Sequence, residues 1–343
     1  MAKPEIGGQA VIEGVLMRSG SSHCVANRLP DGSIVLKRGT YQSLTKRFLL
    51  FKLPIIRGVI LLFEMLFIGI EALTYSSNLA IANTPDPNSD STNSDTEKVD
   101  SCSSATVDQA DQSETAAADT EPMSRFEIFK TILISLIFAI LIFLVAPYAL
   151  ARWIPGIDQS SVSFHALEGL IRLCFFFLYV LLISRMDDIR RVFMYHGAEH
   201  KCVFCYEAGI QPTPQKARDF SPHHPRCGTN FVFIVIMVSV VCFSFIKTES
   251  FMTHLALKLI FVPFIAGIAY EILKTSARIP ALAFLAYPGL AFQRLTAFEP
   301  DDQMLEVAAA ALLEVARMEG IEITETRAPQ PCSPDTGESS GDS

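Results

Sequence analysis

Two short stretches of the sequence concentrate side chains that can bind a metal ion or move a proton. The first, YHGAEHKCVFCYE at residues 195–207, places His196, Glu199 and His200 in the order H-x-x-E-H. On a helix, residues four apart share a face, so both imidazoles can point at one ion. The carboxylate between them can take a proton from a water bound to that ion. The pattern therefore predicts a divalent metal site, with zinc as the favoured ion and Glu199 as general base.

The second stretch, SPHHPRCGTN at residues 221–230, supplies ligands that the first lacks. We expect His224 or Cys227 to complete the metal site, because imidazole nitrogen and thiolate sulfur are the usual protein ligands of zinc. Arg226 or Lys201 is expected to stabilise an anion during the reaction. Hydrolysis through a metal-activated water is the reaction that such a site supports most readily.

The same residues allow a second grouping. Cys202 and Cys205, in the order C-x-x-C, can join His223 or His224 and Cys227 in a closed zinc knuckle that staples the loop without catalysing a reaction. A simpler interpretation of Cys202 and Cys205 is that they are small buried residues beside a Val-Phe pair, and we favour it over metal binding.

The composition indicates which elements position these stretches. Half of the 343 residues are hydrophobic, Phe outnumbers Trp 25 to one, and the mean hydropathy is +0.33. These values favour a mainly α, polytopic membrane protein over a soluble domain. We expect about four transmembrane helices, at residues 126–150, 164–183, 231–246 and 255–273.

Segment 54–82 is apolar but differs from these four. Arg57, Glu64 and Glu71 recur every seven residues and so fall on one helical face. Three ionisable groups in a row are costly against lipid. We therefore expect an interfacial or re-entrant helix here.

The distribution of charge predicts the orientation in the membrane. The link 184–230, which carries both polar stretches, holds seven Lys and Arg, whereas the links 151–163 and 247–254 hold one each. The positive-inside rule places link 184–230 and both termini in the cytoplasm. The N-terminus lacks the pattern of a cleaved signal peptide, and the eight cysteines do not form a disulfide framework. We expect a multi-pass protein of the inner (cytoplasmic) membrane.

The remaining segments are expected to be soluble. A β-hairpin is predicted around Pro30-Asp31-Gly32, and an amphipathic cytoplasmic helix capped by Asp301 or Asp302 is predicted near the C-terminus. Acidic stretches without large apolar residues predict disorder. The chain is thus expected to divide into an N-terminal region at 1–53, the helix at 54–82, an acidic disordered linker at 83–123, a membrane domain at 124–298, a C-terminal helix at 299–326 and a disordered tail at 327–343.

Ionisable residues also occur within the apolar segments. His165, Glu168 and Arg172 share one helical face, and a second charged row lies at residues 271–278. Such groups mark internal ion pairs, interfacial anchors or an ion path. Spacing alone does not distinguish these roles.

Four motifs, GGQAVIEGVLMRS, YHGAEHK, FCYE and HPRCGTNF, together resemble the YqhQ-like family, bacterial membrane proteins that are predicted to be metal-dependent enzymes and have no settled reaction. The resemblance spans most of the chain apart from the acidic linker and the two ends. The functional residues that it implies are His196, Glu199, His200, His224 and Cys227, while Glu13 and Arg18 fall in its N-terminal motif.

We therefore expect a metal-dependent membrane hydrolase that acts at the cytoplasmic membrane surface, on a lipid or a membrane protein and not on nucleic acid. Two alternatives stay open. One is a scaffold or accessory protein stabilised by a structural metal site, and the other is a transporter. An open coordination position favours the enzyme, and four protein ligands favour the scaffold. A polar cavity through Glu168 and Arg172 favours the transporter.

Overall fold

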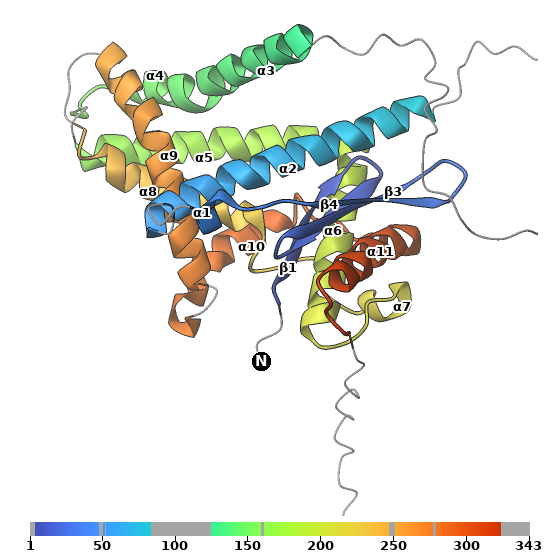
Figure 1. Ribbon diagram of the computed structural model, residues 1–343. Helices are drawn as coiled ribbons and strands as arrows, with labels where there is room; N and C mark the ends of the chain where they lie inside the picture. The colour runs from blue at the N-terminus through green and yellow to red at the C-terminus, as the bar shows by residue number, and fades with distance from the viewer. Residues whose placement is uncertain are drawn as a thin grey trace, which may run out of the picture.

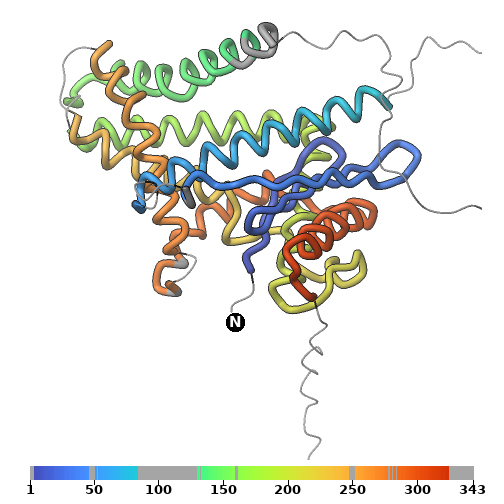
Figure 2. Tube along the Cα trace, in the orientation of Figure 1, coloured from blue at the N-terminus to red at the C-terminus, as the bar shows by residue number. Residues whose placement is uncertain are grey.

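The computed structural model describes residues 4–47, 51, 53–83, 125–158, 161–246, 251–276 and 279–323. Within these residues the protein is mainly helical and carries one antiparallel sheet near its N-terminus (Figures 1 and 2). The acidic linker and the C-terminal tail, both expected to be disordered, lie outside the described residues, except for the first residue of the linker.

The sheet is a four-stranded meander in which each strand pairs with the next in sequence. The predicted hairpin is confirmed: its strands end at Arg28 and restart at Ile34, which pair with each other. The sequence did not predict the two strands before it, because glycine-rich segments have low strand propensity. These strands form because each pairs with its neighbour in the sheet. The strands are β1 (Ile6–Val11), β2 (Gly14–Ser19), β3 (Ser22–Arg28) and β4 (Ile34–Thr40).

Helices cover both faces of the sheet. Helix α2 (Pro54–Ala82) packs its Ile68 and Ala72 against one face, where they form a small core with Val11, Leu16 and Val25. The opposite face carries the largest core of the protein, formed with α6 (Asp187–Glu207) and α11 (Asp302–Met318). Figure 1 shows α2 on one side of the sheet and α11 on the other.

Helix α11 is the C-terminal helix that the sequence predicted, and it is shorter than the expected segment. Asp301 caps it, since its carboxylate accepts a hydrogen bond from Met304 N–H at 2.8 Å. Its apolar face is fully buried, and each large side chain there, such as Leu305 or Leu312, contributes roughly 1.5–3 kcal/mol to folding. Arg38 of the sheet pairs with Glu314 at 2.5 Å. The helix is therefore part of the core that supports α6.

Within the described residues, three helical segments are long and apolar enough to cross a membrane: Leu133–Arg152, Val162–Ile183 and Met252–Ser276. The first comprises the C-terminal half of α3 (Arg125–Ile140), the π-helical turn η2 (Leu141–Val145) and α4 (Ala146–Arg152), and the others are α5 (Val162–Ile183) and most of α9 (Phe251–Ser276). Three of the four expected spans are thus found. The expected span at 231–246 instead forms α8 (Gly228–Phe243), which is apolar but has 16 residues. It is therefore only about 24 Å long, against the ~30 Å of a hydrocarbon core.

The charged row of α2 is paired within the protein. Arg57 forms an ion pair with Glu271 of α9 at 2.7 Å. Glu64 accepts hydrogen bonds from residues 43 and 44, beside the short helix α1 (Leu44–Arg47), and Glu71 pairs with Lys37 of β4 at 3.1 Å. The row thus joins α2 to α9 and to the sheet. The position of α2 relative to the membrane stays a prediction.

Candidate metal centre

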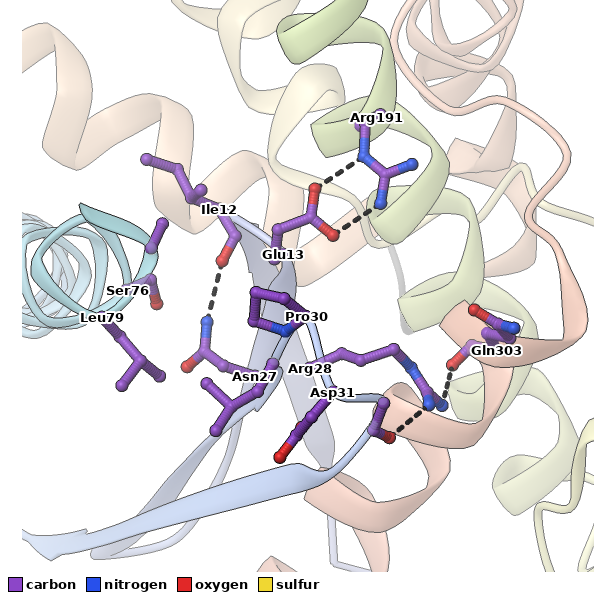
Figure 3. Close-up of a pocket in the computed structure, with 13 residues that line it drawn as sticks. Ile12, Glu13, Asn27, Arg28, Pro30, Asp31, Ser76, Leu79, Arg191 and Gln303 are labelled. Atoms are coloured by element: carbon purple, nitrogen blue, oxygen red, sulfur yellow. Dashed lines mark hydrogen bonds and ion pairs between the residues drawn. The ribbon is translucent and has the colours of Figure 1, made fainter. Parts of the chain in front are cut away.

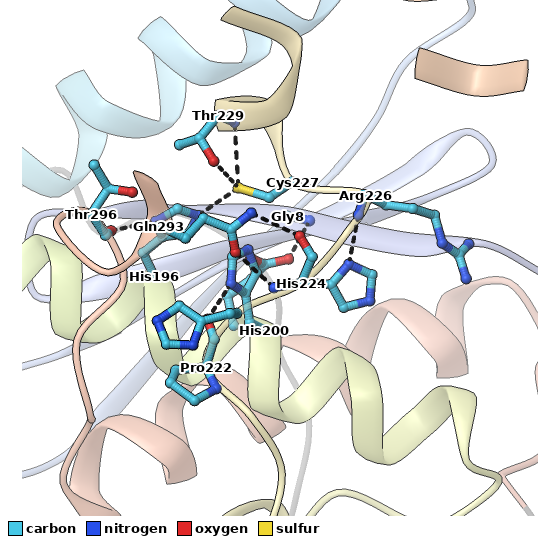
Figure 4. A network of polar contacts seen from close by, with 12 residues as sticks. Gly8, His196, His200, Pro222, His224, Arg226, Cys227, Thr229, Gln293 and Thr296 are labelled. Carbon is cyan, nitrogen blue, oxygen red and sulfur yellow. Dashed lines mark hydrogen bonds and ion pairs between the residues drawn. The ribbon is translucent and has the colours of Figure 1, made fainter. Parts of the chain in front are cut away.

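Helix α6 brings the two histidines of the H-x-x-E-H motif together. Asp187 and Asp188 lie in its first turn, where the helix dipole favours negative charge, and the chain leaves it through Gly209 at φ +81°. The rings of His196 and His200 lie next to each other, with their centroids 4.3 Å apart and their planes tilted by 56° (Figure 4). The four-residue spacing therefore gives the shared face that the sequence predicted.

Backbone carbonyls hold both imidazoles in one orientation. His196 Nδ1 lies 2.7 Å from Thr296 O, and His200 Nδ1 lies 2.6 Å from Pro222 O. A carbonyl oxygen only accepts hydrogen bonds, so we assign the proton of each neutral ring to Nδ1. The lone pairs of both Nε2 atoms then point away from these carbonyls, and that of His196 faces Cys227 Sγ at 3.2 Å. Metal-binding histidines are commonly fixed in this way.

Cys227 points its sulfur at the same place from another element. It is the N-cap of α8, and its Sγ accepts hydrogen bonds from Thr229 N–H at 3.5 Å and Thr229 Oγ1 at 3.4 Å. Sγ lies 3.2 Å from His196 Nε2, and the ligand atoms of His196, His200 and Cys227 all lie within 4.8 Å of one another. Tetrahedral zinc with ordinary bond lengths would separate such a nitrogen and sulfur by about 3.5 Å. The three residues can therefore hold one ion.

Glu199 lies beside this group and is buried. Its Oε1 accepts a hydrogen bond from Gly8 N–H of β1 at 3.0 Å, and its Oε2 lies 3.4 Å from His200 Nε2. Burial raises the pKa of Glu199, with the nearby histidines acting in the opposite direction. A side chain at Gly8 would clash with the backbone of β2 and come within 3.2 Å of Glu199 Cγ, so the glycine permits β1 to cross the site.

Gly197 has a similar role on α6. A Cβ there would lie 2.0 Å from Phe298 O. The glycine lets segment 296–298 pass directly over the helix, which is how Thr296 O reaches His196. It weakens the helix by up to about 1 kcal/mol relative to alanine. Close approach of the backbone explains why a glycine interrupts the motif.

The ring of His224 lies beside the three candidate ligands, with its centroid 5.7 Å from that of His200, but its nitrogens are not among the atoms that converge. Arg226 N–H donates to His224 Nδ1 at 3.2 Å, and His224 Nε2 lies 3.4 Å from Glu207 Oε2, so both ring nitrogens have partners. Gln293 of α10 (Tyr287–Gln293) holds its backbone through two hydrogen bonds of 2.7 and 2.8 Å. Of the two candidates for the third ligand, this geometry favours Cys227.

The two cations predicted to stabilise an anion lie in different places. Arg226 pairs with Glu207 at 2.8 Å, at the edge of the site. Burial alone would raise the pKa of Glu207, but His224 and Arg226 together lower it. Lys201 is buried on another side of α6, where it donates to Arg218 O at 2.7 Å and pairs with Glu299 at 2.5 Å. Arg226 is therefore the better placed of the two.

Cys202 and Cys205 belong to the core between α6, α11 and the sheet. Burial raises the pKa of both thiols, that of Cys205 to about 11. Their sulfurs contact the backbone oxygens of Leu305 and Ile210 at 3.7 and 3.6 Å. They do not join Cys227, so the zinc-knuckle grouping is not formed and the interpretation as small buried residues holds.

The N-terminal motif attaches the sheet to α6. Glu13 adopts a positive φ of 49° in the turn between β1 and β2, and its carboxylate forms two 2.6 Å hydrogen bonds with Arg191. Glu13 and Arg191 also line a cavity of about 550 Å³ beside the β3–β4 turn, apart from the histidines (Figure 3). Arg18 stacks on the ring of Tyr41 at 4.3 Å. The Glu13–Arg191 pair thus ties the turn between β1 and β2 to α6.

Sequence reasoning missed the residues that support the ligands. Thr296 and Pro222 act through backbone carbonyls, which leave no signal in residue type. Gln293 has no motif around it. Gly8 lies in a glycine-rich motif that was singled out, but nothing in the motif indicates its partner.

By distance alone, a second buried group, His165, Glu168 and His254, could also hold an ion.

Comparison with known proteins gives a family but no activity. The family profile described as "Protein of unknown function (DUF1385)" matches residues 53–318. The chain is 30% identical to the uncharacterized protein YqhQ of Bacillus subtilis (strain 168) over 322 residues. This alignment covers 93% of this chain and 94% of the relative. No solved structure matches it. Since the family profile covers well over half of the chain, the chain belongs to the DUF1385 family.

Proposed function

We propose that the protein is a metal-dependent hydrolase whose site lies at the cytoplasmic surface of the membrane. One observation carries the proposal. His196 and His200 have their Nδ1–H groups bound to backbone carbonyls, so both Nε2 lone pairs converge with the sulfur of Cys227. This arrangement of donors suits Zn²⁺.

The donor set favours a catalytic ion over a structural one. Three protein ligands leave one position of a tetrahedral ion open, whereas structural zinc sites are closed by four. Cys227 sits at the N-terminus of α8, where the helix dipole favours the thiolate that a metal ion requires. The hydrogen bonds that Thr229 donates to the Cys227 sulfur also favour the negatively charged thiolate.

A bound ion would supply an acidified water molecule at the open position. Glu199 is placed to accept the proton, because Oε2 faces His200 Nε2 at 3.4 Å while Gly8 N–H holds Oε1. A dication beside the carboxylate favours its ionised form and so opposes the effect of burial. Arg226, at the edge of the site, is available to bind an anionic group of the substrate.

The position of the site suggests the class of substrate. Cys227 is the residue from which the apolar helix α8 begins, and the loop that carries it is rich in Lys and Arg. Positive-inside places this loop in the cytoplasm. A lipid or a membrane protein can reach a site at that depth without leaving the bilayer.

Metal analysis of the purified full-length protein tests the proposal. We expect about one Zn²⁺ per chain for the wild type, and loss of the metal in His200→Ala and Cys227→Ala. His223→Ala is the matched control, since this neighbouring histidine lies outside the three ligands, and it should keep the metal. Wild-type protein that stays metal-free after incubation with Zn²⁺, or a Cys227→Ala protein that binds as tightly as the wild type, contradicts the proposal.

A further inference from the structure

A second polar cluster lies between α5 and α9, two of the candidate membrane helices. The sequence indicated three of its members on one face of α5, and the structure adds His254 and Lys258 from α9. His165, Glu168, His254 and Lys258 are each 1–3% exposed. The fifth member, Arg172, has a side chain that is 11% exposed. Ionisable groups this deep between apolar helices usually serve a function.

The cluster carries an excess of positive charge. Lys258 Nζ lies 2.5 Å from both oxygens of Glu168, and Arg172 Nη2 lies 2.6 Å from Oε1. Arg172 also donates to Phe143 O in the π-helical turn and to Ser239 Oγ of α8, both neutral acceptors. In the described part of the chain, Glu168 is the only carboxylate that pairs with either cation. Two cations against one anion leave a buried net charge of +1.

The two histidines add hydrogen-bonding groups that have no partner in the part of the chain that the structure describes. Their rings stack with centroids 5.8 Å apart and an interplanar angle of 5°. Among the described residues, neither nitrogen of His165 has a hydrogen-bond partner, nor has His254 Nε2. The carboxylate of Glu168 approaches His165 Nδ1 only to 3.5 Å. A neutral imidazole carries one N–H donor, and leaving a buried donor unpaired is unfavourable.

Helix ends add to the positive potential. His165 lies in the first turn of α5, which begins at Val162, and His254 lies in the first turn of α9, which begins at Phe251. The N-terminal end of each helix dipole is positive. Both helices therefore present positive ends at the side of the cluster where the unpaired imidazoles lie.

We propose that these five side chains form a binding site for a small monovalent anion of halide size. Such an anion neutralises the buried charge of +1 and accepts hydrogen bonds from the imidazoles. A divalent metal ion would instead raise the buried charge to +3 beside Lys258, although the distances among His165, Glu168 and His254 alone permit one. Burial of the cluster excludes a lipid headgroup.

Chloride binding to full-length protein in nanodiscs of zwitterionic lipid tests this site. Chloride replaces gluconate at constant ionic strength, and both the ³⁵Cl line width and the melting temperature are measured. We expect saturable binding that raises the melting temperature. Lys258→Met removes the net charge and should weaken binding at least about tenfold. Glu168→Gln raises the net charge and should tighten binding by a similar factor, about tenfold.

A double variant keeps the test decisive if Lys258→Met alone does not fold. Lys258→Met with Glu168→Gln restores the net charge to +1 and should return chloride affinity towards the wild-type value. Arg185→Gln, which removes an equal charge from an exposed position, is the control and should change nothing. Absence of saturable chloride binding overturns the proposal. So does a Glu168→Gln protein that loses chloride binding, or a wild-type cluster that binds Zn²⁺ and loses it on this substitution.

Discussion

Replacing Gly197 with alanine perturbs the metal centre without touching a ligand. The new Cβ would lie 2.0 Å from Phe298 O, and atoms at this position essentially never come closer than 3.0 Å. Segment 296–298 must therefore retreat by at least about 1 Å, which lengthens the 2.7 Å hydrogen bond from His196 to Thr296 O. Loss of such a supporting bond commonly weakens metal binding about 10–100-fold.

Global stability should change much less. Overpacking costs about 1–3 kcal/mol, and alanine returns up to about 1 kcal/mol of helix propensity, so the free energy of unfolding should fall by no more than ~3 kcal/mol. Competition with a chromophoric zinc chelator measures the affinity, and thermal unfolding measures the stability. Gly228→Ala is the matched control, because a Cβ there, next to Cys227, meets nothing within 4 Å. A Gly197→Ala protein that binds Zn²⁺ as tightly as the wild type refutes the role assigned to Thr296.

Three further predictions follow from the described contacts. Glu199→Gln should retain zinc but lose the cellular function that the wild type complements, and a metal-loaded variant with full function would favour the scaffold. Hydrogen bonds from two arginines, chiefly Arg317, lower the pKa of Glu314 to about 2. Their stabilisation is thus present above the ordinary value of 4.5 and is lost as the pH falls towards 2, so Glu314→Gln should flatten the dependence of melting temperature on pH in this range. An impermeant thiol reagent added outside the cell should label Pro155→Cys and spare Gln215→Cys, and the reverse would invert the predicted topology.

The sequence indicated which residues lie at the candidate metal centre better than it indicated what each of them does. Spacing alone placed His196 and His200 on one face, because helix geometry fixes that relation. The choice between His224 and Cys227 depended on which lone pairs were already used. The nitrogens of His224 are occupied by Glu207 and by the backbone N–H of Arg226, and no motif encodes these contacts.

The fold was predictable where local pattern decides it. The Pro-Asp-Gly turn, the cap of α11 and three apolar spans follow from residue type and length. Strands β1 and β2 were missed, since only the folded structure explains Gly8, which packs against Leu16 and Glu199, and Gly14, which packs against β3. The sequence indicated the three members of the polar cluster that lie on α5. It did not indicate the two on α9, because His254 fell in the expected link 247–254 and Lys258 in the expected apolar span 255–273.

The hydrogen bond from Gly8 to Glu199 has a consequence for biogenesis. The centre combines β1, α6, the loop before α8 and the carbonyl of Thr296, so nearly 300 residues separate its first and last contributions. A ribosome must translate past residue 296, and the apolar helices between must be inserted, before the pocket exists. Metal loading is therefore expected to be late and post-translational, and nascent chains that stall within α8 or α9 should emerge without zinc.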